Sequence, residues 1–257
     1  MPASSPPASS AVSPAYPPSG TLAVGNYCFA GVYTPTSGNF YNTASDTSSD
    51  ECFTVAKIDT TTSTQWHSTT GNPLTLGDGG GAYDTATVHG NSVGGAPTGS
   101  VTFYSCYNAT TSPTDCGSSG DPGTLVPPTA SPAAANPAGL TASGNNATAT
   151  SPVLPITKAG NYCFYATYGG SAIYNGSADT DTSTECFTVA QAPTTTVTQQ
   201  SVTSGTVVLG GGGASDLATV TGNTAGGAPT GTVTFYSCYN ATTSPTGCNA
   251  STGTLVP

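Results

Sequence analysis

The chain has 257 residues and a formal net charge of −10, because twelve acidic residues stand against two basic ones, Lys57 and Lys158. Nucleic-acid binding needs Lys and Arg to neutralise phosphates, and an anionic membrane surface repels an acidic chain, so we expect neither partner. No run of about 18 apolar residues occurs, so we expect no membrane insertion.

Short alternating runs of apolar and polar residues, separated by Gly, Pro, Ser, Thr and Asn, are typical of β-strands joined by turns. Strong helix formers are scarce, and no stretch keeps a 3.6-residue period over three turns. The sequence therefore predicts an all-β fold. A Pro- and Ser-rich lead over residues 1–20 comes first, and the central strands are expected near residues 60–66, 82–89, 99–107, 123–126, 147–155, 160–168 and 185–190.

Seven short strands with frequent turns suit a two-sheet antiparallel sandwich. Because successive side chains of a strand point to opposite faces, the pattern predicts which residues fill the core. These are Val101, Phe103, Phe164, Ala166, Tyr168, Phe187 and Val189. The same alternation places Cys106, Cys163 and Cys186 on the outer faces.

Internal repetition defines the organisation of the chain. The stretch 94–114 recurs almost unchanged at 226–246, Gly160–Phe164 echoes Gly25–Phe29, and Glu185–Ala190 echoes Glu51–Ala56. The cysteines recur with nearly the same offset from one copy to the next, so the repeating unit has the length of the stretch 57–190.

The repeat divides the chain into one complete unit flanked by two partial ones. Residues 57–190 form the complete unit, residues 1–56 match the second half of a unit, and residues 191–257 match the first half. Half a sandwich exposes apolar strand edges and needs a complement. The chain is a window on a longer array, or copies join head to tail, or the two partial units of one chain close on each other; we favour a filament.

The segment from Pro97 to Tyr104, the later Gly-Asn-Tyr-x-Phe-x-Ala-Thr-Tyr strand and the closing Phe187-Thr188-Val189 together resemble the bacterial immunoglobulin-like repeat domains of large surface proteins. The resemblance extends over every unit, whole or partial. It implies tandem immunoglobulin-like β-sandwich repeats, a spacer or adhesive role outside the cell, and no catalysis or cofactor.

Eight regularly placed cysteines indicate an oxidising compartment and an extracellular or cell-surface location. Since the N-terminus lacks a signal-peptide pattern, we expect that the export signal is missing from this sequence. Spacing predicts four local disulfides, each inside one half of a unit. The pairs are Cys28–Cys52, Cys106–Cys116, Cys163–Cys186 and Cys238–Cys248.

Other sites are weaker predictions. Asp179, Asp181 and Glu185, echoed by Asp46, Asp50 and Glu51, are candidates for Ca²⁺, although a solvated turn explains them equally. A zinc site is not expected, because no Cys-x-x-Cys pair occurs and the two histidines are isolated. Five sequons lie in or beside predicted turns and are candidate N-glycosylation sites: Asn108, Asn146, Asn175, Asn240 and Asn249.

The leading functional hypothesis is an extracellular structural protein, a repeat subunit or segment of a surface fibre or stalk whose partner is a further copy or a neighbouring repeat. The alternative is an adhesin or glycan-binding module that uses the loops 77–83 and 169–175. Its sugar-stacking residues would be the tyrosines Tyr104, Tyr107, Tyr165 and Tyr174, although we favour packing of these rings against neighbouring repeats or over the outer sheet. No catalytic triad, nucleophile elbow or Trp-lined cleft is discernible, so we expect no enzyme.

Overall fold

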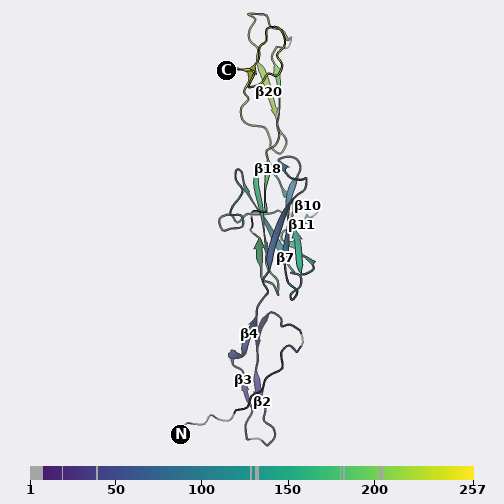
Figure 1. Cartoon of the computed structure of the whole chain (residues 1–257), viewed down its shortest axis with the longest axis vertical. Coiled ribbons are helices and arrows are strands. Elements are labelled where there is room, and N and C mark those ends of the chain that lie inside the picture. Colours follow the sequence, from purple (N-terminus) through teal and green to yellow (C-terminus); the bar gives the residue numbers. More distant parts are fainter. Residues whose placement is uncertain are drawn as a thin grey trace, which may run out of the picture.

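A computed structural model describes residues 8–18, 20–38, 40–127, 129–130, 133–179, 181, 183–202 and 205–257. The molecule is elongated, with three parts in a row along its long axis (Figure 1). We call them the N-terminal segment (residues 20–56), the central unit (57–190) and the C-terminal segment (191–257). The described residues form antiparallel β-sheets, and their only helix is the single 3₁₀ turn η1 (Ser49–Glu51), so the all-β prediction is confirmed.

The larger sheet of the central unit has the strand order β12-β8-β16-β18-β6, with β9 beside β8 and β17 beside β16. Its neighbours are antiparallel except for the short parallel contact between β18 and β6. The strands are β6 (Leu74–Thr75), β8 (Ser100–Asn108), β9 (Thr124–Leu125), β12 (Ala138–Gly139), β16 (Gly160–Tyr168), β17 (Ser177–Asp179) and β18 (Cys186–Ala190).

The smaller sheet has the order β13-β14-β7-β15, with β5 pairing along β7. Its strands are β5 (Thr61–Ser68), β7 (Gly81–His89), β13 (Thr141–Ser143), β14 (Asn146–Thr150) and β15 (Leu154–Pro155). A separate hairpin joins β10 (Thr129–Ala130) to β11 (Ala133–Ala134). All seven predicted strand regions contain strands; the pattern missed the shortest pieces, whose periodicity is too brief to detect.

Both sheets contribute side chains to one hydrophobic core. Ala86 and Val88 of β7 join Val101 and Phe103 of β8 and Phe164 of β16 in a single cluster. Burying an aliphatic or aromatic side chain of this size contributes about 1.5–3 kcal/mol. The alternating pattern therefore identified the core face correctly.

Alternation places Cys106 and Cys163 on the outer face of the sheet, and in the structure this face carries a small core of its own. They do lie opposite the main core, but they form a second buried cluster with Cys116 and Tyr165. The Cys106–Cys116 bridge folds the intervening loop back over the sheet, where the Tyr165 hydroxyl donates to the Pro122 carbonyl. A disulfide therefore builds a small core where alternation alone predicts solvent.

The two terminal segments contain only two-stranded sheets. In the N-terminal segment, β1 pairs with β4 and β2 with β3; in the C-terminal segment, β19 pairs with β20 and β21 with β22. Their bounds are β1 (Gly25–Cys28), β2 (Gly31–Tyr33), β3 (Ala44–Asp46), β4 (Cys52–Val55), β19 (Thr195–Gln200), β20 (Asp216–Thr221), β21 (Tyr236–Ser237) and β22 (Thr254–Leu255). None of the described residues in either segment is buried.

Candidate functional site

The N-terminal segment reproduces the last strands of the central unit. In β1 and β4, Cys28 faces Cys52 and Tyr27 faces Phe53; in β16 and β18 the register is the same, two cysteines opposite each other and a Tyr opposite a Phe. The ring centroids of Tyr27 and Phe53 lie 5.5 Å apart, the same spacing as in the matching pair of the central unit. The segment therefore holds its half of a unit already in place.

The C-terminal segment reproduces the first strands of the central unit in the same way. Gln200 of β19 faces Asp216 of β20, as Trp66 of β5 faces Asp84 of β7. The amide of Val256 donates to the carbonyl of Phe235 at 3.0 Å, as the amide of Val126 donates to the carbonyl of Phe103 at 3.1 Å in the central unit. Both half-units are thus ordered without their complements.

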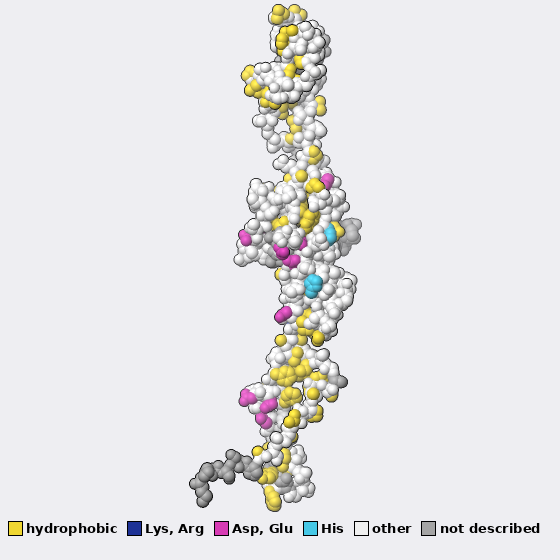
Figure 2. All heavy atoms as spheres, viewed as in Figure 1, with side chains coloured by type: hydrophobic (Ala, Val, Ile, Leu, Met, Phe, Trp, Pro, Cys, Tyr) yellow, Lys and Arg dark blue, Asp and Glu magenta, His cyan; other side chains and the backbone are white. Residues whose placement is uncertain are grey.

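What the segments lack is the opposing half of a core. Phe187 is 6% exposed in the central unit, whereas its counterpart Phe53 is 38% exposed. Val126 is fully buried, whereas its counterpart Val256 is 47% exposed. Figure 2 shows hydrophobic side chains on the surface of both terminal segments. Each segment therefore presents an unfilled half-core to solvent.

The segments also lack their longest strand pairing. In the central unit, β16 and β8 pair from Tyr168 opposite Val101 to Asn161 opposite Asn108, and this contact joins the two halves of the unit. The counterparts of these strands are residues 25–33 and residues 232–240, which lie at opposite ends of the molecule (Figure 1). Closure of the two segments of one chain on each other is therefore not the arrangement in this structure.

A groove of about 550 Å³ opens on the C-terminal segment between β19, β20, β21 and the end of the chain. It is lined by Thr198, Asp216, Phe235 and Val256, among others. The repeat matches these residues to Thr64, Asp84, Phe103 and Val126 of the central unit. There the equivalent space is taken up by residues of the second half of the unit, which share the core with Phe103 and Val126.

A second hollow, of about 360 Å³, lies where the C-terminal segment leaves the central unit, and Gly222, Gly226 and Gly227 are among its lining residues. Their counterparts in the central unit are Gly90, Gly94 and Gly95. The space over those glycines is filled by the ring of a single buried tyrosine.

That tyrosine is Tyr174, which is fully buried. Its hydroxyl donates to the Gly95 carbonyl at 2.6 Å, and a Cβ built on Gly94 would lie 2.4 Å from the same hydroxyl, so only glycine allows the ring to approach. The counterpart in the N-terminal segment is Tyr41, which is 67% exposed. Filled sites of the central unit thus correspond to open ones on the C-terminal segment.

The core of the central unit also encloses two carboxyl groups, on Asp84 and Glu185. None of their four carboxyl oxygens has a hydrogen-bond partner among the described residues. Burial raises the pKa of Asp84 to about 7, against the opposing influence of the Thr85 and Gln65 backbone. Burial, and then the neighbouring charges of Asp84 and Asp179, raise the pKa of Glu185 to about 8.

The four disulfides of the structure are the pairs that spacing predicts: Cys28–Cys52, Cys106–Cys116, Cys163–Cys186 and Cys238–Cys248. Each one lies inside a single half-unit, so neither half depends on the other for its cross-links. Such bridges form and persist in oxidising compartments, and the chain therefore belongs to one.

The calcium candidates do not form a donor cluster. Asp179 accepts hydrogen bonds from the amide and hydroxyl of Thr64, Asp181 caps the amide of Ser183 in a turn, and Glu185 faces the core. Within the part of the chain that the structure describes, no three His, Cys, Asp or Glu side chains are placed to hold a metal ion.

The sequons remain predicted modification sites. Asn108, Asn240 and Asn249 are exposed, and the side-chain oxygen of each accepts backbone amides of its own turn. Asn175 is also exposed and donates to Asp59 at 2.7 Å, whereas Asn146 is half-buried in β14.

Two of the tyrosines expected to stack on sugars are not available. Tyr165 and Tyr174 are both buried, so that interpretation of them is wrong. Tyr174 packs into the main core, and Tyr165 stacks on Tyr104 with ring centroids 4.7 Å apart. Alternation could not reveal this, because one tyrosine is covered by a disulfide-closed loop and the other lies in an irregular loop.

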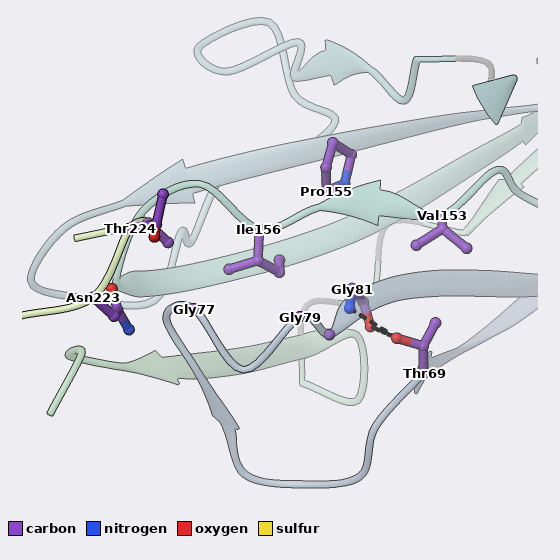
Figure 3. A pocket seen from close by; sticks show the side chains of 11 residues that line it. Thr69, Gly77, Gly79, Gly81, Val153, Pro155, Ile156, Asn223 and Thr224 are labelled. Carbon is purple, nitrogen blue, oxygen red and sulfur yellow. Dashed lines mark hydrogen bonds between the residues drawn. The ribbon is translucent and has the colours of Figure 1, made fainter. Parts of the chain in front are cut away.

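A hollow of about 590 Å³ lies at the junction of the central unit and the C-terminal segment (Figure 3). Glycine backbone from Gly77 to Gly81, the side chains of Val153, Pro155 and Ile156, and Asn223 with its neighbours line it. None of these lining residues is titratable. We interpret the hollow as a joint between repeats.

These features define a disulfide-stabilised all-β protein whose two terminal segments repeat strand pairs of the central unit. No protein-family model matches the chain, and comparisons with curated proteins and with solved structures found no match either. Among the described residues, no helix has the length and hydrophobicity that a membrane span requires.

Proposed function

We propose that this chain is an extracellular structural protein, a subunit of a surface fibre built from immunoglobulin-like sandwich repeats. Copies join head to tail: the N-terminal segment of one copy supplies the second half of a unit, and the C-terminal segment of the next supplies the first half. The observation that carries the proposal is that each open site on one segment has a filled counterpart in the central unit.

The central unit also supplies the register of the joint. Since Cys163 faces Cys106 in the β16–β8 pairing, Cys28 of one copy lies opposite Cys238 of the next. By the same rule, residues 25–33 pair antiparallel with residues 232–240. The joint is heterologous, and such contacts propagate into open filaments when rotation does not close them into a ring.

Two differences make the joint weaker than the central unit. Trp66, whose ring lies 4.6 Å from that of Phe187, is replaced by Gln200, and Tyr165 is replaced by Ala30. Stacked aromatic pairs contribute about 0.5–1.5 kcal/mol beyond their buried area, and both are lost at the joint. We therefore expect subunits to dissociate before the central unit unfolds.

The test compares two neighbouring residues of the same loop in the full chain. Tyr41→Ala removes the side chain expected to fill the hollow over Gly226, while Phe40→Ala removes a ring that is fully exposed and whose counterpart, Ile173, stays 37% exposed. Electron microscopy and light scattering should show filaments for the wild type and for Phe40→Ala, and few or none for Tyr41→Ala. Monodisperse wild-type monomers under all conditions, or equal assembly of the two variants, would contradict the proposed joint.

A further inference from the structure

We propose that each joint between subunits encloses a group of carboxyl side chains that must take up protons before the joint closes, so that assembly is coupled to acidification. This inference rests on the head-to-tail joint of the proposed function. The groups that take up protons are Asp216 on the C-terminal segment of one copy and Glu51 on the N-terminal segment of the next; Asp46, also on that N-terminal segment, is a third acidic residue beside them.

The central unit provides the geometry. Asp84 of β7 belongs to the first half of the unit, and Glu185, directly before β18, belongs to the second half; both are almost completely buried. The two act on each other electrostatically, and Asp179 of β17 acts on both. The carboxyl groups therefore meet across the contact between the two halves.

The counterparts follow from the strand registers. Asp216 faces Gln200 as Asp84 faces Trp66. Glu51 accepts the amide of Phe29 through its backbone carbonyl at 3.1 Å, as Glu185 accepts that of the matching phenylalanine at 3.0 Å.

The position of Asp46, the third acidic residue, also follows from the strand register. Asp46 faces Gly31 in the β2–β3 pair, as Asp179 faces Ala166 in the β16–β17 pair. Asp179 accepts hydrogen bonds from Thr64, at 2.7 Å from the amide and 3.1 Å from the hydroxyl, and the counterpart of this threonine is Thr198, which lines the open groove.

No cation is available at the joint to neutralise these groups. Residues 1–56 and 191–257 contain no Lys, Arg or His. Besides the three carboxyls, the titratable side chains of the two segments near these positions are Asp50, Tyr27, Tyr33 and Tyr236, none of which carries a positive charge. In the central unit the basic side chains contact other groups: Lys57 binds the Ser171 carbonyl and Lys158 lies over the Tyr107 ring. His67 stacks on Tyr83, and His89 shares a hydrogen bond with Ser63.

Burying an unpaired carboxylate costs far more than burying a carboxylic acid, so a group of this kind neutralises instead. In the unassembled chain Glu51 and Asp216 are exposed to water. Docking therefore draws protons from solution, and assembly weakens as the pH rises. The raised pKa values of Asp84 and Glu185, about 7 and about 8, mark the range in which the loss should occur.

The experiment follows the critical concentration for filament formation of the full chain between about pH 5 and about pH 8, by sedimentation and light scattering, in buffer with EDTA. Each unit of pKa shift corresponds to about a tenfold change in the equilibrium, so we expect the wild-type critical concentration to rise at least about tenfold over this range. The double variant Glu51→Gln with Asp216→Asn, whose amides imitate the protonated groups, should assemble equally at both ends. Glu185→Gln is the matched control, and assembly of that variant should keep the wild-type pH dependence.

The outcomes separate this inference from the proposed joint. Wild-type filaments that form equally well at about pH 5 and about pH 8 would overturn the proton coupling and leave the joint intact. Assembly at about pH 8 that requires added Ca²⁺ would assign the neutralising charge to a metal ion instead. Absence of filaments in every variant at every pH would remove the joint itself.

Discussion

The central unit and the terminal segments share nearly the same strand sequences and registers, yet only the central unit has an interior. Phe187 and Phe53 occupy equivalent positions, each beside an equivalent tyrosine at the same distance, and Phe187 is buried while Phe53 is 38% exposed. The difference does not lie in the residues. It arises because the central unit holds both halves and each segment holds one.

The comparison also separates what is local from what is not. Hairpin pairing, turn hydrogen bonds and disulfides are present in all three parts, because each forms between residues that lie close together in the sequence. Burial appears only where β16 pairs with β8, a contact between strands that lie far apart in the sequence. Local order is thus present in all three parts, whereas among the described residues the core is confined to the central unit.

The first prediction compares the removal of the same aromatic ring from the central unit and from the C-terminal segment. Phe103→Ala should lower the free energy of unfolding of the central unit by about 3–5 kcal/mol, because Phe103 is fully buried in the main core. Phe235→Ala, the same change on the C-terminal segment, should leave that transition in place. Denaturant unfolding of the full chain under conditions that keep it monomeric measures both.

Equal destabilisation by the two variants would mean that the C-terminal segment has a core of its own. In the proposed filaments, by contrast, the Phe235 ring is buried at the joint. We therefore expect Phe235→Ala to raise the critical concentration for filament formation.

The second prediction concerns pH. In the folded central unit Asp84 and Glu185 keep their protons up to about pH 7 and about pH 8, whereas the unfolded chain loses them near pH 4. The folded state therefore binds more protons between these limits, and its stability falls as the pH rises through them, by about 4 kcal/mol for each group. Glu185→Gln should flatten this decline, as followed by denaturation midpoints at several pH values.

A control for that experiment is Glu51→Gln, which makes the same change at the exposed counterpart. It should leave the pH profile of the monomeric central unit unaltered. A wild-type profile that rises with pH would show that the carboxyl pair is ionised in the folded state.

The third prediction uses two disulfides with the same sequence separation of 10 residues. Replacing Cys106 and Cys116 by Ala should destabilise the central unit by about 2–3 kcal/mol, because the loop that their disulfide closes also covers a buried cluster. Replacing Cys238 and Cys248 by Ala should leave the central transition unchanged and speed hydrogen exchange in the C-terminal segment alone. A loss of central stability in the second variant would contradict the independence of the two parts.

Much of this arrangement could be predicted from the sequence. Alternation indicated the core face of β8 and β16, and spacing indicated the disulfide pairs. The boundaries that the internal repeat indicates for the parts stay a prediction. All of these are regular patterns, and regular patterns are what a single sequence displays. The immunoglobulin-like assignment within the all-β fold remains a prediction.

The parts that escaped prediction are irregular or non-local. The burial of Tyr165 depends on a loop folded back by a disulfide, and that of Tyr174 on close approach to glycines much earlier in the chain. Asp84 and Glu185 look like ordinary polar residues in alternating strands, since only the packed halves bring them together. The repeat itself was the available signal, because a carboxyl group recurs at each of these positions in Asp216 and Glu51.

The smallest effect concerns how firmly the C-terminal segment is attached to the central unit. The side-chain amide of Asn223 donates to the Leu76 carbonyl at 2.8 Å, and it packs so closely that a Cβ on Gly77 would lie 2.2 Å from it. Asn223→Ala should cost about 1 kcal/mol of this contact and leave the core intact, so small-angle scattering should show a wider range of end-to-end distances at unchanged central stability.

Asn91→Ala is the matched control, because Asn91 occupies the same turn of the central unit. Both asparagines accept a backbone amide of that turn through their side-chain oxygen, at 2.8 Å in each case, but only Asn223 also reaches across to another part of the molecule. The control should therefore lower central stability slightly without changing the scattering profile. If both variants broadened the profile equally, the turn itself and not the bond to Leu76 would determine how rigidly the central unit and the C-terminal segment are connected. The angle between successive repeats in the proposed filament would then be attributed to the backbone between them.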